Sequence, residues 1–196
     1  EKGSALRRYV HLGTGNYHPR TARLYTDFGL LTCNESLCAD VNEVFKQLTG
    51  LGKASKLNHL LLAPFSLHNA MLAAIRAEAA NARAGKRVRI IAKMNALLDP
   101  EIIEALYDAS QAGVTIDLIV RGVCALRPGI PGLSDHISVR SVIGRFLEHT
   151  RVFYFYADGA QKMYLSSADW MERNFFRRIE LCFPVLEPKL KRRILK

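Results

Sequence analysis

The sequence predicts an α/β fold in which a mixed β-sheet is flanked by helices. Residues 59–120 alternate between apolar strands and amphipathic helices in the order β-α-β-α-β, an order typical of sheets that contain parallel strands. The last third of the chain instead holds short strands, two of them joined by the hairpin signal Ala157-Asp158-Gly159-Ala160. A third observation is that one pattern of small and polar residues occurs twice, 153 positions apart.

The first fifty residues predict one strand and one helix. The apolar run Tyr9–Leu12 is expected to be a strand that opens into a turn of small residues. A helix is predicted over Glu35–Leu48 with Asn34 as its N-cap. Its apolar face is expected to consist of Val41, Val44, Phe45 and Leu48. The segment Gly50–Lys56 has small and charged residues without periodicity, which predicts a linker and hence two domains, residues 1–56 and 57–196.

The alternating region begins with a strand predicted at His59–Ala63. A helix is expected to run from Ser66 to about Arg83. Ser66 is a suitable N-cap, and Gly85 stands where the end of a helix favours a left-handed residue. The next strand is predicted at Val88–Lys93.

A second helix of this region is predicted to begin at Asp99-Pro100-Glu101 and to end at Gly113, because a proline suits the first turn of a helix. The strand Val114–Val120 follows. The remaining elements are expected to be short strands and one basic helix: Val139–Ile143, Val152–Tyr156, Lys162–Leu165, Leu181–Val185 and the helix Pro188–Leu195.

The repeated pattern consists of a strand, a small-residue turn and an acidic residue. The first copy is Gly13-Thr14-Gly15-Asn16, with Asp27 eleven residues later. The second copy is Ser166-Ser167-Ala168-Asp169, with Glu180 eleven residues later. His149 stands twenty residues before the end of the second turn, whereas the equivalent position of the first copy falls before the first residue. The chain is therefore expected to be a piece of a longer protein, with another histidine upstream.

Composition indicates a globular protein with an anionic ligand. With 196 residues and 49% hydrophobic content, the chain can fill a core. Its net charge of +10 predicts a polyanionic partner such as phosphate chains, nucleotides, nucleic acid or an anionic membrane surface. The four cysteines lack the spacing and density of a disulfide scaffold, and no apolar run approaches the roughly 20 residues of a membrane span. A reduced, cytoplasmic environment is therefore expected.

His149 is the first candidate for chemistry. It lies in Glu148-His149-Thr150-Arg151, immediately before a strand, where alternation puts the histidine and Arg151 on one face. A histidine beside a cation can attack, protonate or bind a phosphoryl group. Glu180 and Asp27 hold equivalent positions of the repeat and could orient a histidine tautomer. The simpler alternatives are a hydrogen-bonded histidine at a strand edge and carboxylates that pair with nearby arginines.

Phosphate and nucleotide ligands are expected near the ends of strands. Arg121 follows the strand Val114–Val120 and precedes a glycine, and its guanidinium fork suits a phosphate there. The alternative is a surface arginine. Tyr25, close to Arg20 and Arg23, could stack on a base or belong to the core. The sequence contains neither Gly-x-x-x-x-Gly-Lys-Ser/Thr nor Gly-x-Gly-x-x-Gly, so neither of these nucleotide-binding motifs applies.

The repeated unit resembles the phospholipase D superfamily, whose members pair two His-x-Lys motifs at one site. Five stretches are more closely similar to the bacterial polyphosphate kinase family that synthesises long chains. They are Tyr9–Tyr17, Thr21–Asp27, Val120–Cys124, Glu148–Val152 and Tyr164–Met171, in the family's order. The resemblance implies a phospholipase D-like fold. Residues 1–56 would be the end of the first catalytic C-terminal domain, and residues 57–196 most of the second.

The resemblance also implies a reaction. In that family a histidine of a His-Ala-Lys motif accepts the γ-phosphoryl group of ATP and passes it to polyphosphate, reversibly and with Mg²⁺. That motif is absent from this sequence. Family residues that bind nucleotide match Tyr25, Arg121 and His149. His149 also matches a second active-site histidine, thought to act as acid or base, and Glu180 matches a catalytically important acid. The arginines assigned to Mg²⁺ lie upstream, so no metal ligand is predicted in this chain.

The expected ligands are therefore ATP or ADP, Mg²⁺ and inorganic polyphosphate, without nucleic acid. The full-length protein is expected to be a cytoplasmic homo-oligomer, with peripheral association at the inner membrane as a further expectation, and the fragment alone is predicted to be inactive. Two alternatives remain. One is a phospholipase D-type phosphodiesterase or nuclease acting through His149, although Arg151 stands where a lysine is usual. The other is a non-enzymatic polyanion-binding module.

Overall fold

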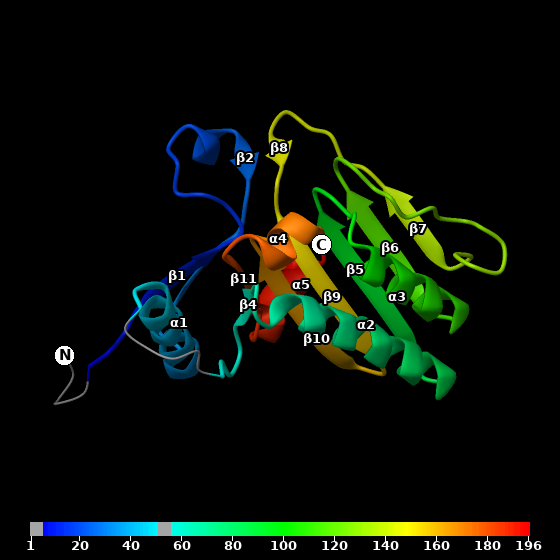
Figure 1. The fold of residues 1–196 in the computed structure, drawn as a ribbon, viewed down its shortest axis with the longest axis horizontal. Helices are drawn as coiled ribbons and strands as arrows, with labels where there is room; N and C mark the ends of the chain where they lie inside the picture. Colours follow the sequence, from blue (N-terminus) through cyan, green and yellow to red (C-terminus); the bar gives the residue numbers. More distant parts are fainter. Residues whose placement is uncertain (1–5, 51–55) are drawn as a thin grey trace.

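A seven-stranded mixed sheet forms the centre of the computed structural model, which describes residues 6–50 and 56–196. Its strand order is β4-β11-β10-β9-β5-β6-β7 (Figure 1). The strands are β4 Leu61–Ala63, β5 Val88–Met94, β6 Thr115–Val120, β7 Ile137–Arg140, β9 Arg151–Ala157, β10 Ala160–Ser166 and β11 Glu180–Pro184. The predicted mixed sheet flanked by helices is confirmed.

The strands of the alternating region are not all neighbours. β5, β6 and β7 pair in parallel, as the β-α-β order predicts. β4, however, lies at the opposite edge of the sheet, where it pairs with β11 in antiparallel fashion. The hairpin of β9 and β10, together with β11, occupies the space between β4 and β5.

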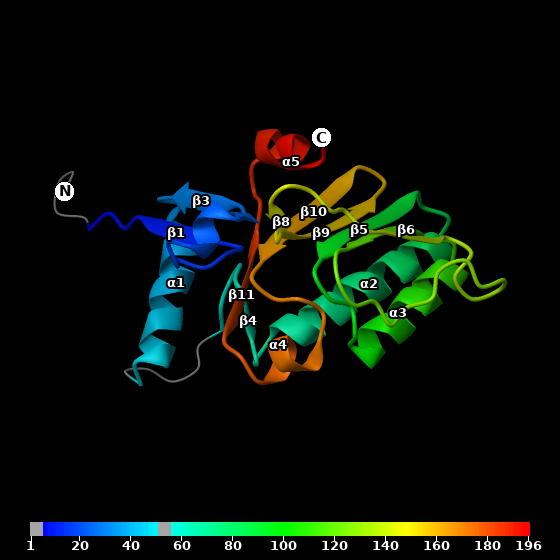
Figure 2. The ribbon, with the colours of Figure 1, turned by 90° about the horizontal axis from the view of Figure 1, so that it is seen from above.

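Helices cover the two faces of the sheet unequally. Figure 2 shows α2 (Leu67–Arg83) and α3 (Pro100–Gln111) on one face and α5 (Pro188–Ile194) on the other, with the short α4 (Glu172–Phe176) near the start of α2. Successive residues of a strand face opposite sides. Phe153 of β9 therefore packs in the core with α2 and α3, whereas Val152 packs in a second core on the other face.

Local signals set the ends of the helices. The Asp99 side chain accepts a hydrogen bond from the N–H of Ile102 at 3.0 Å, and α3 ends before Gly113, whose φ is +94°. Ser66 precedes α2 as predicted, but its hydroxyl does not cap the helix. It accepts instead from the N–H of Leu62 at 3.0 Å, which stabilises the turn between β4 and α2.

The bounds of β4 and β7 differ clearly from the predicted ones. β4 begins at Leu61 rather than His59, because the Asp40 carboxylate binds the N–H groups of His59 and Leu60 at 2.6 and 2.9 Å. β7 covers Ile137–Arg140 rather than Val139–Ile143. Ile143 lies in the loop after the strand and is 90% exposed.

Residues 6–50, here called the first unit, form a small hairpin with one long helix. β1 (Val10–Gly13) pairs with β3 (Gly29–Thr32) in antiparallel fashion. The helix α1 covers Glu35–Leu48, and Asn34 caps it by accepting from the N–H of Leu37 at 3.1 Å.

The predicted apolar face of α1 is partly wrong. Phe45 and Leu48 are 63% and 50% exposed, and the residues that α1 buries begin with Leu37 and Cys38. The position of the helix on the second unit decides which side is covered, and periodicity alone does not reveal that position.

Residues 56–196, the second unit, contact the first unit through a strand pair that the sequence does not reveal. β2 (Tyr25–Thr26) lies parallel to β8 (Leu147–Glu148) (Figure 1). Most of the predicted linker lies outside the described residues, so the predicted domain boundary at residue 56 stays a prediction. Within residues 6–50 and 56–196, every helix is too short or too polar to cross a membrane.

The strands β1 and β3 and the helix α1 of the first unit correspond, in the same register, to β10, β11 and α5 of the second. In the first unit, Leu12 lies opposite Leu30 and Gly13 opposite Gly29. In the second unit, the pairs 153 positions later, Leu165 with Phe183 and Ser166 with Cys182, lie opposite each other in β10 and β11. The helices that follow, α1 and α5, begin at residues 35 and 188, the same offset apart. The repeat in the sequence is therefore a repeat in three dimensions.

Candidate active site

Two equivalent hydrogen-bond arrangements hold the acidic residues of the repeat. In the first unit, the Thr14 hydroxyl donates to Asp27 Oδ1 at 2.7 Å and accepts from the N–H of Phe28 at 3.0 Å. In the second unit, the Ser167 hydroxyl donates to Glu180 Oε2 at 2.5 Å and accepts from the N–H of Leu181 at 3.0 Å. Each carboxylate is thus fixed by the small-residue turn of its own unit.

Asp27 of the first unit holds the histidine of the second. Its Oδ1 and Oδ2 lie 2.9 and 3.0 Å from His149 Nδ1. A carboxylate only accepts hydrogen bonds, so Nδ1 carries the proton and Nε2 keeps a lone pair. The N–H of His149 donates to the Thr26 hydroxyl at 3.3 Å, and the Tyr25 ring lies 4.8 Å from the imidazole. Pairing of β2 with β8 brings these residues together.

Arg151 lies beside His149 but faces inward. Its Nη1 is 2.8 Å from His149 Nε2 and 3.2 Å from Nδ1, while Nε and Nη2 bind the two oxygens of Asp169 at 3.1 and 2.9 Å. The prediction that the histidine and Arg151 share one face is therefore confirmed.

The pKa of His149 lies below its ordinary value. Burial disfavours the charged imidazolium most, and the neighbouring Arg151 guanidinium lowers the pKa further, while Asp27 and Asp169 oppose both. His149 is therefore mainly a neutral imidazole at pH 7, and its unprotonated Nε2 faces Arg151 Nη1.

Glu180 occupies the position equivalent to Asp27, yet no histidine of the described chain contacts it. Its Oε1 accepts from Asn174 Nδ2 at 2.5 Å, and Arg178 Nη1 lies 3.7 Å away. The carboxylate is buried, so its hydrogen bonds to Asn174 and Ser167 are what stabilise it in this chain.

Arg121 connects to the same network from the end of β6. Its Nε donates to Asn95 Oδ1 at 2.9 Å, and the N–H of Asn95 donates to Asp169 Oδ1 at 2.7 Å. Asp169 in turn binds Arg151, which contacts His149. The sequence-predicted residues Tyr25, Arg121 and His149 therefore belong to one connected region, while Arg20 and Arg23 lie exposed around a short 3₁₀ helix, η1 (Thr21–Arg23).

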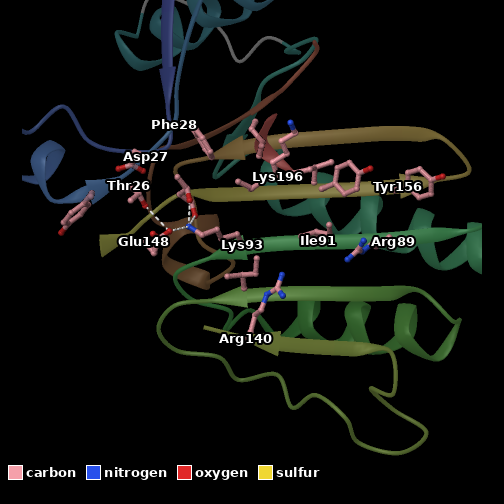
Figure 3. Close-up of a pocket in the computed structure, with 17 residues that line it drawn as sticks. Thr26, Asp27, Phe28, Arg89, Ile91, Lys93, Arg140, Glu148, Tyr156 and Lys196 are labelled. Carbon is pink, nitrogen blue, oxygen red and sulfur yellow. Dashed lines mark hydrogen bonds and ion pairs between the residues drawn. The ribbon is translucent and has the colours of Figure 1, made fainter. Parts of the chain in front are cut away.

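A groove of about 910 Å³ opens beside Asp27, and Glu148 and Thr150, the neighbours of His149 in the chain, also line it (Figure 3). It runs over the face of β5, β6 and β9 that α2 and α3 leave uncovered. Lys93 lies at its centre, with Nζ 3.0 Å from Glu148 Oε2 and within hydrogen-bond distance of the Thr150 hydroxyl. Lys93 thus fixes the residues on both sides of His149.

The residues present do not form a metal site. Among residues 6–50 and 56–196, no group of three or more histidine, cysteine, aspartate or glutamate side chains is arranged to hold a metal ion. We therefore assign no step of any reaction in this chain to Mg²⁺.

Comparison with known proteins identifies both units. A family model described as "Polyphosphate kinase C-terminal domain 2" matches residues 60–196, and one described as "Polyphosphate kinase C-terminal domain 1" matches residues 1–54. The chain belongs to the polyphosphate kinase family. This confirms the family expected from the five sequence stretches.

Individual relatives agree with this assignment. A polyphosphate kinase of Burkholderia ambifaria (strain MC40-6) is 66% identical over all 196 residues, and one of Paraburkholderia phytofirmans is 64% identical over 192 residues. The crystal structure of polyphosphate kinase from Porphyromonas gingivalis superimposes with a TM-score of 0.92 and 41% identity, covering 96% of this chain and 29% of that one. The chain spans 28% of the length of each of these two curated polyphosphate kinases.

Sequence reasoning named His149, Asp27 and Glu180, and it allowed Asp169 to fix a phosphate oxygen or a neighbouring side chain, but it missed Thr14, Ser167 and the contacts of Arg151. Thr14 and Ser167 hold the same place in the two turns, so the repeat itself was a usable signal for them. The partners of Arg151 lie 18 and 137 positions away, and no local pattern reports them.

Gly15 gives a direct test of the Asp27–His149 contact in this polyphosphate kinase region. A Cβ atom on Gly15 would overlap the Asp27 carboxylate, so Gly15→Ala should displace it. Because Asp27 raises the pKa of His149, that pKa should fall, and an NMR titration of the imidazole measures the change. Gly13→Ala is the matched control, since the nearest contact of its Cβ would be 3.5 Å, to His11 Cε1. An unchanged titration in Gly15→Ala would contradict the contact.

Proposed function

We propose that the full-length protein is an ATP:polyphosphate phosphotransferase. It moves the γ-phosphoryl group of ATP to an inorganic polyphosphate chain, reversibly, through a phosphohistidine whose histidine lies outside this chain. In the first step, a nitrogen of that histidine forms an N–P bond as the P–O bond to ADP breaks. In the second, a terminal oxygen of polyphosphate forms a P–O bond as the N–P bond breaks, so the chain grows by one phosphate.

The contact between Asp27 and His149 is the observation that supports this proposal best. A carboxylate at Nδ1 fixes the ring and makes Nε2 the unprotonated nitrogen, which lies 2.8 Å from Arg151 Nη1. The lowered pKa keeps His149 neutral, so we assign it the role of accepting and returning a proton during phosphoryl transfer.

The repeat extends this reasoning to Glu180. Ser167 holds Glu180 as Thr14 holds Asp27, and Asp27 reaches a histidine of the other unit. We therefore assign Glu180 the role of binding Nδ1 of the upstream acceptor histidine, which would present Nε2 of that histidine to the γ-phosphate.

Tyr25 and Arg121 are proposed nucleotide ligands. Tyr25 packs against the imidazole of His149, and its ring offers a surface on which a base can stack. Arg121 is anchored through Nε to Asn95, which leaves its two terminal amino groups to bind phosphate oxygens. Cations along the groove suit an anionic chain; they are Arg89, Lys93, Arg140 and Lys196.

Acid-labile labelling from γ-³²P-ATP tests the proposal. The measurement compares this chain with a version extended upstream through the whole first catalytic domain. We expect label on the extended chain alone, because the acceptor histidine lies before the first residue, and we expect no polyphosphate synthesis by the shorter chain.

Other results would change the assignment. Label on the 196-residue chain itself would make one of its own histidines the acceptor. Absence of label on both, together with cleavage of a generic phosphodiester that depends on His149, would favour a phospholipase D-type phosphodiesterase. Binding of polyanions without nucleotide preference and independent of His149 would favour a non-enzymatic module. For the full-length protein, the cytoplasmic location, the homo-oligomeric state and the association with the membrane stay predictions.

A further inference from the structure

We propose that Arg151, the cation of the His149-Thr150-Arg151 motif, is a positioning residue and not a phosphate ligand. Its guanidinium joins the turn of the first unit, the turn of the second unit and the imidazole of His149. The kinetic part of this proposal rests on the proposed phosphotransferase function, whereas the geometric part is independent of it.

The guanidinium has no free edge for a phosphate. Nε and Nη2 donate to the two oxygens of Asp169 at 3.1 and 2.9 Å. Nη1 donates to the carbonyl oxygen of Thr14 at 3.4 Å and lies 2.8 Å from His149 Nε2. A phosphate is bound best by two parallel N–H groups of one guanidinium. In Arg151 the edge formed by Nε and Nη2 already binds a carboxylate, and the side chain is only 8% exposed.

The Asp169 carboxylate, which binds Nε and Nη2 of Arg151, is itself held in place. It accepts from the N–H of Asn95 at 2.7 Å, and its side chain is 10% exposed. Burial alone would raise its pKa, but hydrogen bonds and charge from Arg151, together with backbone N–H groups of Asn95 and Ala96, hold that pKa below its ordinary value. The ion pair is therefore intact throughout the neutral range, and Arg151 cannot swing to a substrate without leaving a buried carboxylate unpaired.

Only an arginine can contact Asp169, the Thr14 carbonyl oxygen and the His149 imidazole at the same time. A lysine has one nitrogen on a flexible stem, so it can pair with Asp169 but cannot also span to Thr14 and His149 with fixed geometry. Arg121 contrasts with Arg151, because it is partly exposed and its side chain is held in residues 6–50 and 56–196 through the one bond from Nε to Asn95. The two arginines should therefore affect the enzyme differently.

The charge of Arg151 also acts on His149. The charged groups around the imidazole are Asp27 directly after β2, Arg151 from β9 and Asp169 from the second turn, and Tyr25 packs on the ring. Lys93 and Glu148 pair with each other beside it. Arg151 is the one cation whose effect lowers the histidine's pKa here. Removing its charge should therefore raise that pKa, and the imidazole should begin to take up its proton at higher pH.

The experiment compares Arg151→Lys, Arg151→Met and Arg121→Met in the full-length protein. Arg151→Lys should lower kcat about 10²-fold, because the imidazole is no longer fixed, and should change KM for ATP and polyphosphate less than about 3-fold. Arg151→Met should in addition shift the acid limb of the kcat profile to higher pH. Arg121→Met should raise KM and leave the pH profile in place. Circular dichroism checks the fold of each variant.

A second readout does not depend on activity. In histidine-labelled full-length protein, with the signal assigned through His149→Gln, the imidazole should titrate at higher pH in Arg151→Met than in the wild type. Should Arg151→Met fail to fold, Asp169→Asn keeps the arginine but weakens its anchor, and it should lower kcat with KM unchanged.

Two outcomes would overturn the proposal. One is an Arg151→Lys enzyme with kcat within about 2-fold of the wild type, because a general cation would then suffice. The other is a 10-fold rise in KM for polyphosphate without a shift of the His149 titration, which would make Arg151 a phosphate ligand. If the wild-type protein forms no polyphosphate, the proposed function fails, and the imidazole titration still tests the role of Arg151.

Discussion

His149→Gln in the full-length protein should reduce polyphosphate synthesis by about 10²- to 10⁴-fold, the usual contribution of a positioned general acid or base. Glutamine cannot transfer a proton at neutral pH. The loss should appear in kcat, because the proposed role belongs to the transfer step and not only to substrate binding. Initial rates of radiolabelled polyphosphate formation at saturating ATP measure it.

His136→Gln is the matched control for this variant. His136 lies exposed in the loop before β7, away from the residues of the site, and its replacement should leave the rate within about 2-fold. A full rate in His149→Gln would remove His149 from the mechanism. Formation of the phosphohistidine should survive in this variant if His149 serves the second step, so labelling separates the two steps.

Asp40→Ala should lower the free energy of unfolding by about 1–3 kcal/mol, the usual cost of a buried donor left unpaired, because the N–H of the buried Leu60 loses its acceptor. The Asp40 carboxylate is buried at the contact between α1 and the start of the second unit. It accepts from the backbone N–H groups of Asn58, His59 and Leu60 at 3.0, 2.6 and 2.9 Å. Urea unfolding of the chain, followed by the fluorescence of Trp170, its one tryptophan, measures the loss.

The pH dependence of the same variant gives a second check. Burial alone would raise the pKa of Asp40, but the hydrogen bonds from residues 58–60 outweigh it and hold the pKa below its ordinary value. A carboxyl with a lowered native pKa stabilises the fold above its unfolded pKa of about 3.9, and that contribution is lost as the pH falls through the native pKa. The difference in stability between the wild type and Asp40→Ala should therefore be full at pH 7 and shrink below about pH 4.

Asp108→Asn, at an exposed position of α3, provides the comparison for Asp40. Its effect on stability should stay within about 0.5 kcal/mol, because a solvated carboxylate loses little on neutralisation. Equal stabilities of Asp40→Ala and the wild type would mean that the contact between α1 and residues 58–60 contributes nothing.

Local chemistry made much of the fold predictable. Asn34 and Asp99 cap their helices, Gly85 and Gly113 end theirs, and the hairpin at Asp158 has the left-handed backbone that its sequence predicts, with φ +42°. These signals act over a few residues, so one sequence is enough to read them.

Contacts between distant segments were not predictable in the same way. The pairing of β2 with β8 involves two residues from each strand, 122 positions apart, and neither strand is long enough to show a period. The exposure of Phe45 and the edge position of β4 depend on which elements, distant in the sequence, pack against them. For the site, the repeat pointed to Asp27 and His149 separately, but their mutual contact depends on how the two units dock.

The docking of the two units has a further consequence. Asp27 of the first unit serves a histidine of the second, and on the proposed assignment Glu180 of the second serves a histidine of the first. A small rotation between the units would therefore separate both carboxylates from both histidines in a single movement. On the proposed assignment, both carboxylate–histidine contacts therefore depend on one geometric quantity, the angle at which the two units pack.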